Sequence, residues 1–211
     1  MQQRLSYIEA LILEGEGQML DFKYNISDSR KLARSIVAFA NTDGGTLLIG
    51  VRDNGSIAGI RSEEELYMLE AAANMYSKPE IVFKAHEWTI DKKHVLEVIV
   101  NPAEIKPHYA LDENGQWKAW IRNGDQNILA NKVMLKIWQR KHQNKGSLFR
   151  YTSKEKVLLD YLKKNPAAEL KYIQDLLRVP KYLTENILVT LIVLDIVEIV
   201  IEDKDIKYTI K

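Results

Sequence analysis

The feature of this sequence that most constrains its fold is the stretch IVAFANTDGGTLLIGVRD at residues 36–53. It begins as the apolar end of a helix, breaks at Asn-Thr-Asp-Gly-Gly, and restarts as an apolar run at residues 46–51. Such a run, bounded by turn residues, is typical of a central strand covered on both faces. The paired glycines favour a left-handed stop for the helix, a conformation that a side chain with a Cβ resists.

The end of this strand carries a turn signal and a carboxylate. Arg52-Asp53-Asn54-Gly55 contains Asn-Gly, the pair that favours a type I′ hairpin turn. Asp53 is therefore expected where a buried strand reaches the surface. That placement often serves chemistry, although an ordinary turn aspartate is commoner.

The rest of the chain mixes helices and strands without a strict βαβ repeat, which predicts an α+β fold. After a polar linker, three short helices and two short strands follow in the order found in a winged helix. The predicted helices of the first part lie at 3–14, 28–41, 62–76 and 129–142, and its strands at 18–24, 46–51, 56–60, 80–88, 93–100 and 117–122. The predicted domains are 1–143 and 151–211, with the linker at 144–150.

Basic charge is concentrated in one segment although the whole chain carries only +1. Residues 126–154 hold seven Lys or Arg and no acid, and three of these cations lie four apart, which places them in one stripe on a helix. Such a stripe binds phosphates without reading sequence. The alternatives are a solvated helix face or a helix docked on the acidic first domain. The cations are Lys132, Lys136, Arg140, Lys141, Lys145, Arg150 and Lys154.

Several classes of function are excluded or disfavoured. The chain has no cysteine, which rules out disulfides, a Cys nucleophile and Cys-based zinc sites. No G-x-x-x-x-G-K-[ST] motif supports ATP binding. No segment approaches the roughly 18 apolar residues of a membrane helix, so we expect a soluble, cytoplasmic protein without a membrane partner.

Three carboxylates are candidates for chemistry: Glu16 before the first strand, Asp21 on its polar face, and Asp53. If the strands are neighbours, these acids converge, and a divalent cation commonly relieves their repulsion. The alternative is a set of solvated strand-end acids. Lys23 shares the face of Asp21 and either contacts phosphate or neutralises that carboxylate. Arg122 is a candidate partner for a phosphate or for an internal carboxylate.

The small C-terminal domain admits two interpretations. As a winged helix it would read DNA through its third helix, at about 181–195, which offers Lys181 and neighbouring polar side chains. Its turn, Glu-Asp-Lys-Asp at 202–205, is acidic and would repel phosphate. The apolar run from 187 to 200 favours a buried or self-associating face instead.

Three motifs together resemble the AlbA-type domain of the Schlafen family. They are EGQMLDFK at 16–23, AFANTDGG at 38–45 and IGVRD at 49–53, and Pro-His at 107–108 and WIRNG at 120–124 are similar to a later motif of that family. The resemblance covers roughly residues 10–142.

The resemblance carries two functional implications. In Schlafen proteins that cut RNA, three acids form a metal-dependent nuclease site, and the matching positions here are Glu16, Asp21 and Asp53, with Mg²⁺ or Mn²⁺ as the implied ion. The middle position is usually glutamate, so Asp21, one methylene shorter, departs from the pattern and puts catalysis in question. Bacterial proteins of this kind are more often described as DNA-binding transcriptional regulators, some under a "divergent AAA" name.

The first hypothesis is therefore a DNA-binding transcriptional regulator whose basic segment supplies affinity for DNA or structured RNA. The second is a metal-dependent endoribonuclease, and the third is a dimerising interaction protein without catalysis. Active Schlafen cores resemble two such lobes side by side, and by this analogy of fold we expect a homodimer.

Overall fold

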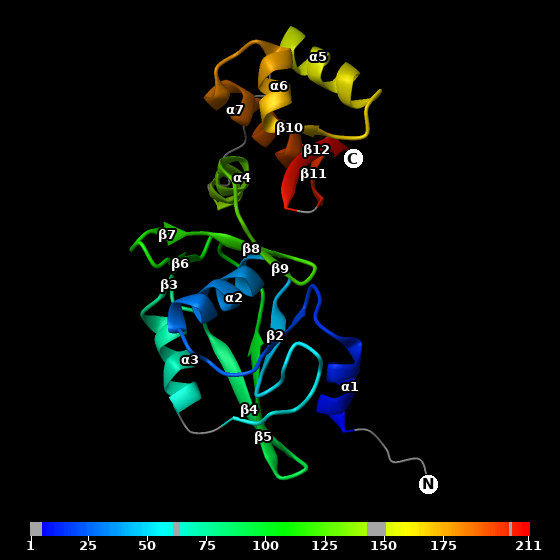
Figure 1. Cartoon of the computed structure of the whole chain (residues 1–211). Coiled ribbons are helices and arrows are strands. Elements are labelled where there is room, and N and C mark those ends of the chain that lie inside the picture. Colours follow the sequence, from blue (N-terminus) through cyan, green and yellow to red (C-terminus); the bar gives the residue numbers. More distant parts are fainter. Residues whose placement is uncertain (1–5, 61–63, 143–150, 203) are drawn as a thin grey trace. The chain divides into compact units, whose positions relative to one another are not determined.

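Residues 6–60, 64–142, 151–202 and 204–211 are described by the structure, a computed structural model. Contacts divide the chain between Leu129 and Ala130 into two units, each of which combines helices with β-structure (Figure 1). The α+β prediction is confirmed. Among the described helices, none is long and apolar enough to cross a membrane.

The first unit is built on a four-stranded sheet in the order β1-β2-β5-β4. β1 runs parallel to β2, and β2–β5 and β5–β4 are antiparallel. The side chains of Leu47, Leu48 and Ile49 on β2 have no exposed surface, which confirms the central strand predicted from the apolar run. The strands are β1 (Leu20–Lys23), β2 (Gly45–Ile49), β4 (Phe83–Ile90) and β5 (Lys93–Val100).

Helices cover both faces of this sheet. On one face α2 (Ser29–Asn41) and α3 (Glu64–Asn74) pack against Leu47 and Ile49. On the other face α1 (Tyr7–Glu14) packs through Ile8, in the same cluster as Leu20, Phe22 and Leu48. Because side chains alternate along a strand, Asp21 and Lys23 point to the face that α2 covers.

The end of α2 explains the glycines and the asparagine of the central motif. Gly44 has φ +79°, and a Cβ on it would lie 2.7 Å from the Val100 carbonyl oxygen. Asn41 Nδ2 donates to the carbonyls of His108 and Trp120, each at 2.8 Å, and its Oδ1 accepts the His108 N–H at 2.7 Å. The motif thus ties the helix to two later segments, one of them through the main chain of His108.

Those later segments form small sheets of short strands. Residues 117–122, predicted as one strand, are divided at Ala119 between two sheets. One sheet has the order β3-β6-β7, and the other is the hairpin β8–β9. The strands are β3 (Ser77–Lys78), β6 (Tyr109–Leu111), β7 (Trp117–Lys118), β8 (Trp120–Asn123) and β9 (Gln126–Leu129).

The turn after β2 differs from the prediction. The Gly55 N–H donates to the Arg52 carbonyl at 2.8 Å, and Gly55 is left-handed at φ +79° whereas Asn54 is not among the residues with positive φ. The turn is therefore centred on Asp53 and Asn54, whereas a type I′ turn needs positive φ at both central residues. The predicted strand 56–60 reduces to one bridge, Val51–Ile57, because the chain folds back onto the carbonyl of Gly50.

The second unit contains four helices and three strands among its described residues. Three of the helices and the terminal hairpin follow the predicted order, and the short β10 pairs with β12 to give a sheet β10-β12-β11. The elements are α4 (Lys132–His142), α5 (Ser153–Leu162), β10 (Ala168–Glu169), α6 (Leu170–Leu177), α7 (Lys181–Val193), β11 (Val197–Glu202) and β12 (Asp205–Ile210).

The position of α4 differs from the predicted division of the chain at 143. Its Val133 and Ile137 are buried in the same core cluster as Leu188 of α7, so the helix belongs to the C-terminal unit. The predicted boundary rested only on the polar composition of the loop after α4. The burial of Val133 and Ile137 places this helix in the second unit. The predicted linker at 144–150, with Lys145 and Arg150, lies outside the described residues.

Candidate functional site

Asp21 lies on β1 and is almost completely buried, at 3% exposed. Its Oδ1 is 3.3 Å from Arg122 Nη2, and its Oδ2 is 2.8 Å from Lys23 Nζ. The lysine contact is an ion pair without hydrogen-bond geometry, because Lys23 Nζ donates to the Phe22 carbonyl and Oδ2 has no hydrogen-bond partner among the described residues. Lys23 therefore neutralises Asp21, one of its two predicted roles.

Arg122 is the buried partner of this carboxylate. It lies on β8 and donates to the carbonyls of Gly17 and Leu20, each at 3.1 Å, and its guanidinium carbon is 5.2 Å from the centre of the Phe39 ring. With 3% of its surface exposed, the side chain joins the β1 region to β8 from inside. The two predicted partners of Arg122 were a phosphate and an internal carboxylate. The structure shows the internal carboxylate, that of Asp21, and the buried guanidinium does not face the solvent.

Glu16 sits beside Asp21. Its Oε1 accepts the Phe22 N–H at 2.8 Å. Burial, followed by the contact with the Asp21 carboxylate, raises the pKa of Glu16, although the Phe22 N–H and the charge of Lys23 act in the opposite direction. The structure thus brings together two of the three predicted acids.

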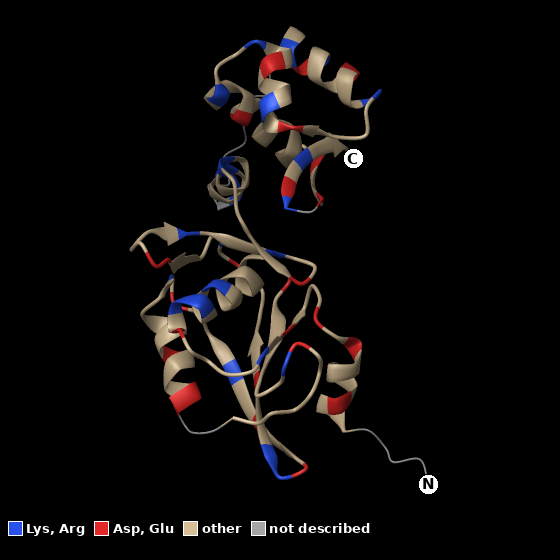
Figure 2. Ribbon diagram, viewed as in Figure 1, with Lys and Arg blue, Asp and Glu red and all other residues tan. Residues whose placement is uncertain are grey.

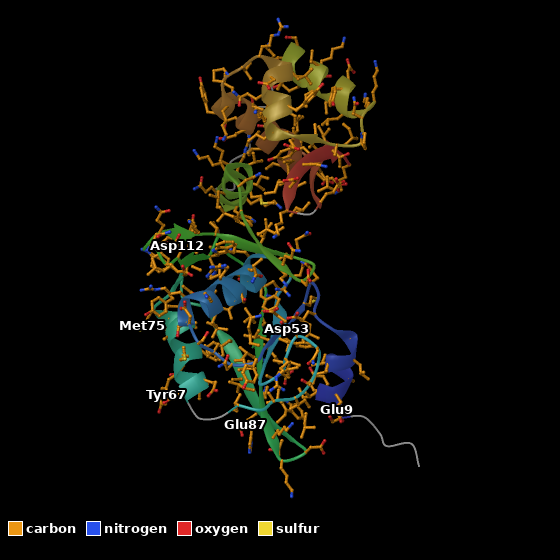
Figure 3. All side chains as sticks on the ribbon, viewed as in Figure 1. Glu9, Asp53, Tyr67, Met75, Glu87 and Asp112 are labelled. Carbon is orange, nitrogen blue, oxygen red and sulfur yellow. The ribbon has the colours of Figure 1, made fainter. Side chains whose placement is uncertain are left out.

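Asp53 does not join this pair. It is exposed on the loop that follows β2 (Figure 3). Within the described residues, no group of three or more His, Asp or Glu side chains is placed to hold a metal ion. Glu16 and Asp21 already face two cations, Lys23 and Arg122, so their repulsion needs no divalent ion. The arrangement does not fit the three-carboxylate site that the resemblance implies.

An open cleft of about 590 Å³ borders Glu16. It lies between the loop before β1 and the glycines after α2, and Glu14, Glu16 and Asp43 line it. Gln18 bridges this edge, donating to Asp43 Oδ2 at 2.9 Å and accepting the Gly124 N–H at 2.9 Å. Its acidic lining disfavours phosphate, so the cleft is a poor site for a nucleic-acid backbone.

The predicted basic stripe on α4 is largely turned toward α7. Lys136 Nζ lies 2.8 Å from Glu185 Oε2 and 2.9 Å from Asn186 Oδ1. Arg140 Nη1 donates to Thr190 Oγ1 at 2.8 Å. These two cations are therefore bonded to another helix of their own unit and do not form a free solvated face. Of the remaining described candidates, Lys132, Lys141 and Lys181 are exposed, and Lys154 is half-buried and donates to the Leu177 carbonyl at 2.8 Å.

A second basic group was missed by the sequence prediction. Arg30, Lys31 and Arg34 lie on α2, which carries blue segments in Figure 2. Their spacing of three and four residues on the polar face of an amphipathic helix was a usable signal. Their aromatic neighbours, Tyr76 and Trp120, come from distant segments, and no local pattern pairs them with α2.

A protein-family model described as "Schlafen, AlbA_2" matches residues 16–131, more than half of the chain. The chain belongs to this family. The matched region ends two residues beyond the boundary of the first unit, which is therefore the Schlafen AlbA_2 domain of the protein.

Two solved structures are similar to this Schlafen AlbA_2 protein. One is the DIP2311 protein of Corynebacterium diphtheriae, at 20% identity and a TM-score of 0.46, where the similarity covers 62% of this chain and 28% of the other. The second is the N-terminal domain of a RecG-related protein of Nitrosomonas europaea, at 22% identity and a TM-score of 0.43, covering 56% of this chain and 89% of that domain. No curated protein is significantly similar in sequence.

Proposed function

We propose that this Schlafen AlbA_2 protein binds nucleic acid and acts as a DNA-binding transcriptional regulator through a C-terminal winged helix. The observation that carries the proposal is the order of elements in the C-terminal unit. A strand lies between the first two of three helices, α5 and α6, and pairs with the last strand of a terminal hairpin. Modules of the helix-turn-helix class place such a third helix in the major groove.

The exposed part of α7 limits how that contact is made. Lys181 and Tyr182 in the first turn are exposed, with Tyr182 at 58%. Farther along, Glu185 and Thr190 are bonded to α4. The proposal therefore assigns DNA contact to the first turn of α7, with Lys132 and Lys141 of α4 as further cations that make no ion pair with a described residue.

Salt-dependent binding by the full chain tests this function. Fluorescence anisotropy with a labelled DNA duplex, single-stranded DNA and structured RNA should give affinities that fall steeply between 50 and 200 mM salt. Lys181→Gln should reduce the slope of log K against log salt by about 1 on the duplex. Lys163→Gln, an exposed lysine at the end of α5, is the control and should change the slope less. Absence of binding to all three probes would refute the proposal.

A metal-dependent endoribonuclease, the second hypothesis from the sequence, stays a prediction, because Asp21 is paired with Lys23 and Arg122 and Asp53 is exposed on its loop. Its test is cleavage of labelled structured RNA and single-stranded DNA with Mg²⁺ or Mn²⁺. Cleavage lost in Asp53→Ala would establish the nuclease and would require Asp53 to join the pair. Retention of the nucleic acid without cleavage would leave a binding protein.

The homodimer implied by the resemblance stays a prediction, as does a role in interaction without catalysis. Val193 and Leu194 at the end of α7 are 37% and 42% exposed, an apolar surface that self-association would cover. Gel filtration with light scattering, on wild type and on Val193→Ser, measures the oligomeric state directly.

A further inference from the structure

The polar face of α2 carries three cations close together. Leu32, Ala33 and Ile36 are buried in the core of the first unit, which turns Arg30, Lys31 and Arg34 outward. Arg30 and Lys31 are exposed and Arg34 is half-buried. Residues three and four apart are neighbours on a helix surface, so these side chains form one patch.

Aromatic rings hold both arginines of this patch. The guanidinium carbon of Arg34 is 4.6 Å from the centre of the Trp120 ring, and that of Arg30 is 5.4 Å from the centre of the Tyr76 ring. A guanidinium stacked on a ring keeps its N–H donors in the plane of the group and available. The loss of side-chain entropy on binding a phosphate is then smaller than for a free arginine.

The patch is not neutralised from within. None of its three cations makes an ion pair with an acid among the described residues. Three acids lie near it. Asp28 caps α2 and accepts the Arg30 N–H at 2.8 Å, and Asp112 and Glu113 line a shallow crevice with α2. Asp112 is already bonded to Lys118 at 2.6 Å and to the N–H groups of its own turn. Three cations therefore face two acids that make no ion pair with a described residue, Asp28 and Glu113.

We propose that Arg30, Lys31 and Arg34 form a phosphate-contact surface of the AlbA_2 domain, which binds the sugar-phosphate backbone of nucleic acid without reading its sequence. This inference rests on the proposed function and gives it a second contact surface, on the other unit. The rings of Trp120 and Tyr76 are covered by guanidinium groups, so they are less available to stack bases. Planar, fixed guanidinium groups match phosphate bidentately, and such contacts position a protein without specifying sequence.

The test compares two full-length variants with the same loss of charge. Arg30→Gln/Lys31→Gln/Arg34→Gln removes the patch. The control, Arg52→Gln/Lys84→Gln/Lys92→Gln, removes three exposed cations elsewhere on the first unit, and Arg52 also stacks on a ring, that of Tyr24 at 4.9 Å. Circular dichroism melting curves establish that both variants are folded.

Anisotropy on duplex DNA between 50 and 200 mM salt then gives the slopes. Loss of three phosphate contacts should reduce the magnitude of the slope by about 2.7, which over this fourfold range makes wild type lose about 40-fold more affinity than the patch variant. The control should keep the wild-type slope. Arg30→Lys/Arg34→Lys preserves the charge and should keep the slope while it weakens binding.

Each other outcome overturns the inference in a distinguishable way. If wild type binds and the patch variant keeps its slope, the surface is wrong while the proposed function stands. If wild type binds no nucleic acid, both fail. If polyglutamate displaces DNA from wild type as well as inorganic polyphosphate of equal charge does, the surface recognises negative charge in general and the assignment to phosphate is wrong.

Discussion

Two helices of this protein carry clusters of cations, and the cations of the two helices have different partners in the structure. On α4, Lys136 and Arg140 are bonded to Glu185 and Thr190 of the neighbouring helix. On α2, Arg30 and Arg34 lie over aromatic rings and have no acidic partner among the described residues. The helix with the stronger basic signal in the sequence therefore has fewer cations available than the one with the weaker signal.

Positive charge along a segment is therefore not the same as positive surface. A cation bonded to a buried acid contributes to the fold, and its charge is compensated locally. A cation stacked on a ring keeps both its charge and its donors.

Two arginines stacked on rings give the sharpest contrast. Arg122→Met should lower the free energy of unfolding by about 3–5 kcal/mol, because Asp21 loses a buried charge partner and the Gly17 and Leu20 carbonyls lose a donor. Arg34→Met should cost less than about 1 kcal/mol, since that guanidinium compensates no acid. Urea unfolding of the two variants measures both values, and equal costs would remove the distinction between internal and available arginines.

The ion pair between α4 and α7 should matter less than Arg122. Lys136→Met leaves the carboxylate of Glu185, which is 3% exposed, without its cation and should cost about 1–3 kcal/mol. The exposed Lys132→Met, on the same helix, should stay within about 0.5 kcal/mol. Combining Lys136→Met with Glu185→Leu should recover most of the loss in chemical denaturation. If the double variant loses the sum of the two single losses in unfolding free energy, Lys136 and Glu185 are not energetically coupled.

The hydrogen bond of Arg140 should contribute about 1 kcal/mol, because Thr190 is a neutral acceptor and both groups are only partly buried. A double-mutant cycle of Arg140→Met with Thr190→Val isolates this contribution from the packing of the two side chains. A coupling free energy near zero would mean that Arg140 is free to contact a ligand, and the contrast with α2 would weaken.

The smallest effect concerns the pH dependence of stability near Asp21. Burial raises the pKa of Glu16, so its contribution to stability is present below the ordinary glutamate pKa and is lost as the pH rises through the raised value. Glu16→Gln should remove this fall in stability with rising pH. The Ser6 N–H lowers the pKa of Glu9, so the contribution of Glu9 to stability is present above the ordinary glutamate pKa and is lost as the pH falls through the lowered value. Glu9→Gln should remove this fall in stability with falling pH. Thermal melts from pH 3 to 8 measure both profiles.

Much of the candidate site could be placed from the sequence, but its connections could not. Strand alternation correctly put Asp21 and Lys23 on one face, and the motif at 36–53 correctly gave a helix stop and a central strand. The contact of Arg122 with Asp21 spans 101 residues, so no local pattern reveals it. Asp53 was grouped with the other acids on the assumption that the strands are neighbours. They are, but the turn that carries Asp53 leaves it exposed and apart from the pair.

The family, the α+β class and the position of the central strand could all be read from the sequence. They depend on short-range periodicity and on glycines that only certain backbone conformations require. Tertiary structure decided which charges remain available. Whether Lys136 faces solvent or Glu185, and whether Arg34 finds Trp120, depends on side chains brought together by the packing of distant apolar residues. Electrostatic interactions act through space, and their partners are set by the fold rather than by neighbours in the sequence.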